Sequence, residues 1–157
     1  MTNHRTAQPR SHYEHRDTRY VAEYVALTWP DSPHWFNVRL GPAPPELRGR
    51  YPGIDVERWA KVWARAADAL VLDGDTCWIV EGELRRPVEA LGELVVYREL
   101  INQTESLRSL WHLRPRCLIL TPLPDPTLEV VLRKLDIESV SYRPPWVEEY
   151  LRKVQRL

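Results

Sequence analysis

The chain has 157 residues, of which 43% are hydrophobic and 28% are charged. This length suits one compact domain and is too short for two domains with separate cores. The 22 basic and 22 acidic residues give a formal net charge of zero, which excludes a generally basic surface that binds nucleic acid through phosphates alone. Any contact with DNA must therefore come from a local group of basic residues.

Residues 1–17 are polar and show no apolar periodicity. We therefore expect a flexible N-terminal arm, followed by a single nuclease-like α/β domain over residues 18–157. The N-terminal stretch does not resemble a signal peptide, and no run approaches the roughly 20 apolar residues of a membrane span. A cytoplasmic protein with no membrane partner is expected.

The first predicted element is an amphipathic helix over residues 18–29, where apolar residues recur at helical spacing before Pro30. Residues 34–40 then alternate between two sets of side chains, which is typical of a strand with one buried face. Residues 41–52 contain four prolines and two glycines, so a long regular element is excluded there. Residues 56–63 are expected to add a helical turn or two.

Two runs rich in β-forming residues, 68–72 and 76–80, are separated by an Asp-Gly-Asp tripeptide. This pattern is a strong signal for a short β-hairpin. A loop of two or four residues keeps Asp68, Glu81 and Glu83 on one face, because side chains alternate with period two, and only an odd-length loop breaks this arrangement. The expected antiparallel pairs are Leu72 with Cys77, Leu70 with Ile79, and Asp68 with Glu81.

The remainder of the chain alternates between predicted helices and strands. Pro87 begins a helix that continues through residue 101. A buried strand over 116–120, a helix over 127–135, a strand over 137–142 and a closing helix over 146–154 follow. This order predicts the α/β class, with a mixed central β-sheet flanked by helices.

The expected pairing of Asp68 with Glu81 has a chemical consequence. Directly opposed carboxylates destabilise a sheet unless something neutral or positive lies between them. A divalent cation would supply that charge, and Mg²⁺ commonly takes one or two carboxylates together with waters and substrate phosphate. Alternatively, these acids lie in water at a strand end or pair with Arg65, Arg85 or Arg86.

Three segments around these acids form a further pattern. Asp68 lies in Ala-Asp-Ala-Leu-Val-Leu-Asp, Glu81 and Glu83 lie in Trp-Ile-Val-Glu-Gly-Glu-Leu, and Glu93 and Tyr97 lie in Ala-Leu-Gly-Glu-Leu-Val-Val-Tyr. Together they resemble the PD-(D/E)XK nuclease superfamily, which has a restriction-endonuclease-like core. In that family an acid on one strand precedes an acid-x-lysine on the next, and a following helix often carries glutamine and tyrosine.

The resemblance implies a role for each matching residue. Asp68 and Glu81 are the metal-ligand positions for Mg²⁺ or Mn²⁺, and with Glu83 they are the candidate catalytic residues. Glu93 and Tyr97 match the accessory helix positions. The first helix offers Glu23 for the family's optional N-terminal acid, and Arg85 and Arg86, just beyond the second strand, are placed to bind phosphate or simply form a solvated strand end.

The departure from the family pattern at Glu83 leaves the function open. It replaces the lysine that would stabilise the attacking water or the phosphate. One interpretation is a Mg²⁺-dependent nuclease acting on DNA, with Glu83 as a further ligand or as the base that activates water. A second is a non-catalytic nuclease-fold component of an assembly, such as a phage head-tail or packaging complex in a virion, whose N-terminal arm contacts a partner. The third, a plain nucleic-acid-binding module, agrees less well with zero net charge.

Overall fold

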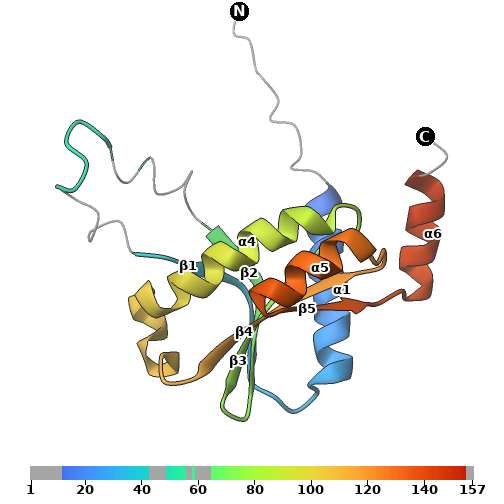
Figure 1. Ribbon diagram of the computed structural model, residues 1–157, viewed down its shortest axis with the longest axis horizontal. Coiled ribbons are helices and arrows are strands. Elements are labelled where there is room, and N and C mark those ends of the chain that lie inside the picture. Colours follow the sequence, from blue (N-terminus) through green and yellow to red (C-terminus); the bar gives the residue numbers. More distant parts are fainter. Residues whose placement is uncertain (1–11, 43–48, 56–57, 59–64, 155–157) are drawn as a thin grey trace, which may run out of the picture.

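A five-stranded sheet forms the centre of the molecule and helices cover both of its faces (Figure 1). The computed structural model describes residues 12–42, 49–55, 58 and 65–154. The elements in chain order are α1 (His12–Thr28), β1 (His34–Leu40), β2 (Arg65–Asp73), β3 (Thr76–Gly82), α4 (Pro87–Leu100), η1 (Ile101–Gln103), η2 (Glu105–Leu110), β4 (Arg114–Thr121), α5 (Pro126–Leu135), β5 (Ile137–Ser141) and α6 (Pro145–Val154). The predicted fold class is confirmed.

The sheet has the strand order β1-β2-β3-β4-β5 and is mixed. β1, β2 and β3 are antiparallel neighbours, whereas β3, β4 and β5 run parallel. The hairpin register agrees with the sequence-based prediction, since Leu72 pairs with Cys77 and Leu70 with Ile79. β1 and β5 are the two edges of the sheet.

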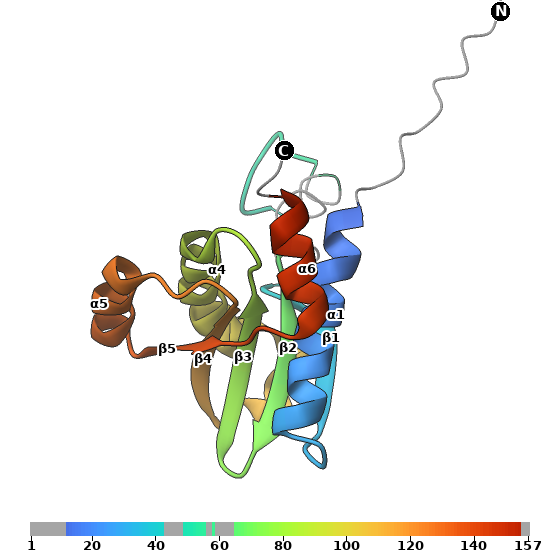
Figure 2. The same ribbon diagram turned by 90° about the vertical axis from the view of Figure 1, so that its right-hand side faces the viewer.

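Two apolar layers hold the helices onto the sheet (Figure 2). The α4 side includes the buried residues Leu70, Ile79, Leu94, Ile119 and Leu132. The α1 side, which also carries α6, includes Tyr20, Val21, Val80, Leu118 and Val147. Each fully buried aliphatic side chain contributes about 1.5–3 kcal/mol, so the two layers fix where α1 and α4 lie over the strands.

At one position along the sheet, the side chains of both β1 and β2 switch from one face to the other. Asn37 has a φ of 52° and lies opposite Asp68, between the pairs Phe36–Ala69 and Val38–Ala67. Phe36 and Ala69 pack on the α1 side, but Val38 and Ala67 pack on the α4 side, although residues two apart share a face in a regular strand. The predicted alternation over residues 34–40 is confirmed, since Phe36, Val38 and Leu40 are more buried than the residues between them. These three side chains do not share one face, because a left-handed residue, which asparagine tolerates, turns the strand over.

The N-terminal boundary also differs from the prediction. Helix α1 begins at His12, so residues 12–17 of the expected flexible arm are helical, and residues 1–11 lie outside the described residues. Most of the helical turn expected over residues 56–63 lies outside them as well. Across the described ranges, none of the helices has the length and apolar character needed to cross a membrane.

Candidate active site

Asp68 and Glu81 lie side by side on β2 and β3, at the end of the hairpin away from its turn. The regular pairing of the two strands ends at Ala69 and Val80. Beyond it, the Asp68 N–H donates to Glu81 Oε1 at 2.8 Å, and the Gly82 N–H donates to Asp68 Oδ2 at 2.9 Å. The predicted juxtaposition of the two acids is present, and each carboxylate replaces a backbone acceptor of the ladder.

Gly82 allows helix α1 to approach this end of β3. A Cβ atom at Gly82 would lie 2.5 Å from Val21 Cγ2 and 3.6 Å from Asp68 Oδ2. A side chain at this position would push α1 away from the sheet, because contacts below 3 Å force atoms to move. The glycine therefore brings α1 close to the two acids.

Asp17 on α1 joins the acidic group. It precedes the buried Val21 by one helical turn, so it lies on the face of α1 that packs on the sheet. Burial, and then the charges of Glu83 and Asp68, raise the pKa of Asp17 to about 7. Asp17 was not among the predicted site residues because the predicted helix began only at residue 18, whereas α1 begins at His12. Continuing the helical spacing of Val21 and Val25 backwards by one turn would have found it.

Glu23, the predicted N-terminal acid, points elsewhere. Its Oε2 accepts a hydrogen bond from Trp146 Nε1 at 2.6 Å, and its Oε1 accepts one from Arg19 Nε at 2.8 Å. Six residues after Asp17, it lies on a different side of the helix. The assignment of Glu23 to the acidic group is therefore corrected in favour of Asp17.

Helix α4 contributes the two accessory residues that the sequence predicted. Glu93 lies close enough to Glu81 for its charge to raise the pKa of that carboxyl group. The buried Tyr97 donates from its hydroxyl to the Ala66 carbonyl at 3.2 Å. Burial, together with the charges of Glu81, Glu93 and Asp68, raises the pKa of Tyr97. Both residues thus reach the start of β2 and the acidic pair.

Burial, followed by the charges of neighbouring acids, governs the electrostatics of the pair. Burial raises the pKa of Asp68, opposed by the Gly82 N–H and reinforced by Glu93 and Glu83. Burial also raises the pKa of Glu81, with the Asp68 carboxylate as the next cause. No ion pair between described residues involves these four acids. In the described part of the chain, arginines therefore do not neutralise Asp68 and Glu81, contrary to the alternative prediction.

Glu83 and the arginines after it form the turn that leads into α4. Glu83 Oε1 accepts the backbone N–H groups of Arg85 at 2.8 Å and Arg86 at 3.0 Å. The Arg86 guanidinium pairs with Glu89 at 3.0 Å on the surface, and Arg85 is exposed. Glu83 thus holds the turn that precedes α4. Of the two predicted phosphate-binding guanidinium groups, that of Arg86 already has a carboxylate partner.

The possible ligand set for a cation is small. Within the described ranges, no group of three or more histidine, cysteine, aspartate or glutamate side chains is arranged to hold a metal ion. The suggestion that Glu83 is a further ligand is therefore corrected. Asp68 and Glu81 remain the two side chains available for such a role.

Comparison with known proteins bears on the fold. No protein-family model and no curated protein matches this sequence. The crystal structure of a repair endonuclease from Pyrococcus abyssi superposes with a TM-score of 0.52 at 14% identity, over 88% of this chain and 50% of that chain. The chain therefore shares its fold with part of that endonuclease. It spans about half the length of that endonuclease, so the function of the acidic group rests on its own geometry.

Proposed function

We propose that this protein is a PD-(D/E)XK-like nuclease that hydrolyses phosphodiester bonds of DNA with Mg²⁺ or Mn²⁺ bound by Asp68 and Glu81. The observation that carries the proposal is the pair formed by the buried Glu81 and the half-buried Asp68, whose charge no ion pair between described residues offsets. The nuclease-like fold supports the substrate class. A cation is the simplest group that would make both carboxylates stable in their ionised form.

The pair fits the coordination habits of Mg²⁺. Each carboxylate has one oxygen bonded to a backbone N–H of the neighbouring strand, which fixes its orientation and leaves its second oxygen as a donor to a cation. Two carboxylates are the number that Mg²⁺ commonly takes from protein when waters and phosphate complete its shell. When bound there, the cation would supply Lewis-acid activation of water and neutralise charge on the phosphate.

The surrounding residues would orient the substrate and move the proton. Asp17, with a pKa of about 7 beside Asp68 and Glu83, is suited to accept a proton from the attacking water near neutral pH. Tyr97 would position the start of β2 through its hydrogen bond to the Ala66 carbonyl, and Glu93 lies close enough to Glu81 to influence its charge. Arg85, exposed just after the acidic pair, is the better placed of the two arginines for a phosphate oxygen.

Isothermal titration with Mn²⁺ and cleavage of supercoiled DNA test this function. Glu81→Gln keeps the size of the side chain and removes its charge, so Mn²⁺ affinity should fall at least tenfold and cleavage should stop. Glu99→Gln, the same substitution at an exposed residue on α4, is the matched control and should alter neither. Unchanged Mn²⁺ binding in Glu81→Gln would falsify the site.

One observation favours the second candidate, a non-catalytic nuclease-fold component of an assembly. Glu83 stands at the position of the family's lysine, and its Oε1 already accepts hydrogen bonds from the backbone N–H groups of Arg85 and Arg86. Under this alternative Mn²⁺ binds but no DNA is cut, whereas Glu83→Lys gains cleavage. The N-terminal arm proposed to contact a partner falls largely in residues 1–11, outside the described residues. A cytoplasmic location for the nuclease and a virion location for the assembly component remain parts of these proposals.

A further inference from the structure

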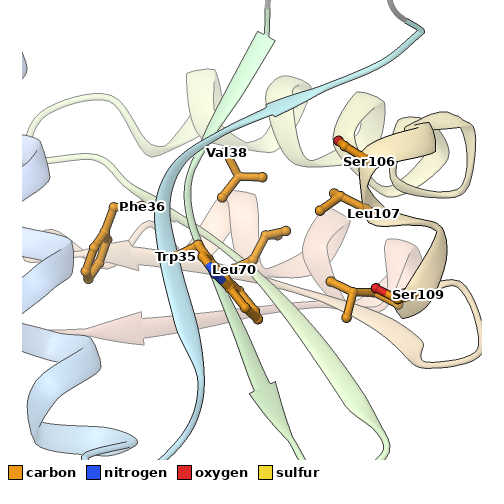
Figure 3. Close-up of a pocket in the computed structure, with 8 residues that line it drawn as sticks. Trp35, Phe36, Val38, Leu70, Ser106, Leu107 and Ser109 are labelled. Carbon is orange, nitrogen blue, oxygen red and sulfur yellow. The ribbon is translucent and has the colours of Figure 1, made fainter.

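A cavity of about 430 Å³ opens between the edge strand β1 and η2 (Figure 3). It is lined by Trp35, Phe36, Val38, Leu70, Ser106, Leu107, Ser109 and Leu110. Trp35 is 46% exposed, so its indole ring meets both the cavity and solvent. The opposite wall carries the side chains of Ser106, Leu107 and Ser109 (Figure 3). The cavity thus combines an aromatic edge, an apolar floor and hydroxyl groups.

The turn-over of β1 at Asn37 shapes the cavity, and the floor of the cavity is close to Asp68 along β2. Because Asn37 turns β1 over, Trp35 and Val38 both line the cavity, while the Phe36 ring points away toward α1 (Figure 3). On the neighbouring strand, Leu70 in the cavity floor is two residues from Asp68, which is about 7 Å along a strand.

We propose that this cavity binds an unpaired nucleobase of single-stranded nucleic acid, as a subsite beside the acidic pair. That the bound base lies next to the phosphodiester to be cleaved rests on the proposed function. Binding of the base itself does not require a metal. Bases stack on exposed aromatic rings without strict sequence preference. Serine hydroxyls can donate to or accept from the polar edge of a base. The volume lies within the range of pockets that hold small organic ligands.

Charge on the same strands complements a phosphate backbone. Arg39 follows Val38 on β1, and Arg65 begins β2, where it pairs with Leu40. Both arginines are exposed, and neither forms an ion pair with another described residue. They form the local basic group that a protein of zero net charge needs in order to contact phosphate.

Fluorescence anisotropy in EDTA tests the subsite without cleavage. The probes are labelled oligo-dT and oligo-U as single strands and a blunt DNA duplex of equal length. Wild type should bind the single strands more tightly than the duplex, and Trp35→Ala should weaken single-strand binding about 5- to 100-fold, the range expected for loss of one stacked base. Trp35→Phe should retain most of the affinity. Leu27→Ala, at a residue 70% exposed on α1, is the control and should change nothing.

A filled cavity provides a second test that leaves Trp35 in place. Ser106 is exposed at the rim, so Ser106→Trp should block the cavity and cause a similar loss while the thermal midpoint stays near that of wild type. Equal affinity for single strands and duplex, or unchanged single-strand binding in both Trp35→Ala and Ser106→Trp, would overturn the proposal. Loss of Mn²⁺ binding in Glu81→Gln tests the acidic pair separately, so failure of one site does not imply failure of the other.

Discussion

Replacing Asp17 by asparagine should stabilise the metal-free protein at alkaline pH and have little effect in acid. In the folded protein the Asp17 pKa is raised from 3.8 to about 7, so between these pH values the folded chain binds a proton that the unfolded chain has lost. Stability supplied by this proton is complete below the unfolded pKa and declines as pH rises through the folded pKa. Asparagine has no carboxylate to ionise, so the variant avoids this decline.

The magnitude follows from the size of the pKa change. A pKa change of 1 corresponds to about 1.4 kcal/mol of free energy. The full change in the Asp17 pKa, from 3.8 to about 7, therefore corresponds to about 4 kcal/mol. Because the side chain is only partly buried, solvent screening reduces the expected gain to about 1–2 kcal/mol. For a chain of this length, that gain raises the unfolding midpoint by about 2–8 °C.

Differential scanning calorimetry in EDTA at pH 4, 6 and 8.5 measures this effect. The gain of Asp17→Asn over wild type should grow with pH and be near zero at pH 4. Asp31→Asn, an exposed change in the turn after α1, should show no such growth. A gain of equal size at pH 4 and pH 8.5, or none at pH 8.5, would refute the placement of Asp17 in the acidic group.

Three further changes probe the contacts around the site. Gly82→Ala should lower the free energy of unfolding by about 1–3 kcal/mol, because the new Cβ would lie 2.5 Å from Val21 Cγ2. In urea titrations, combining it with Val21→Ala should recover part of this loss. Strictly additive losses of the two substitutions would contradict the contact. Glu83→Ala should lower the free energy of unfolding by about 1 kcal/mol, since two N–H groups of the turn lose their acceptor. Faster amide exchange at these two groups should accompany the loss. Glu23→Gln should leave Mn²⁺ affinity as in wild type, whereas Asp17→Asn should weaken it; the reverse outcome in titration calorimetry would restore Glu23 as the N-terminal acid.

The order of elements and the hairpin register follow from the sequence alone. Apolar spacing and the Asp-Gly-Asp turn are local signals, and the pairing of Leu70 with Ile79 follows from turn length. The same register places Asp68 beside Glu81, because side chains alternate regularly along paired strands up to that point. Local chemistry therefore sufficed to predict the central pair of acids.

Only the tertiary structure decided which other groups meet that pair. Asp17 reaches it, and Glu23 does not, because α1 begins before its apolar stripe and packs closely at Gly82. The face change at Asn37 depends on one left-handed residue, which strand periodicity cannot reveal. The commitment of Glu83 to the turn before α4 depends on where that helix packs. These outcomes arise from contacts between segments distant in the chain, whereas sequence patterns report the neighbours within a few residues.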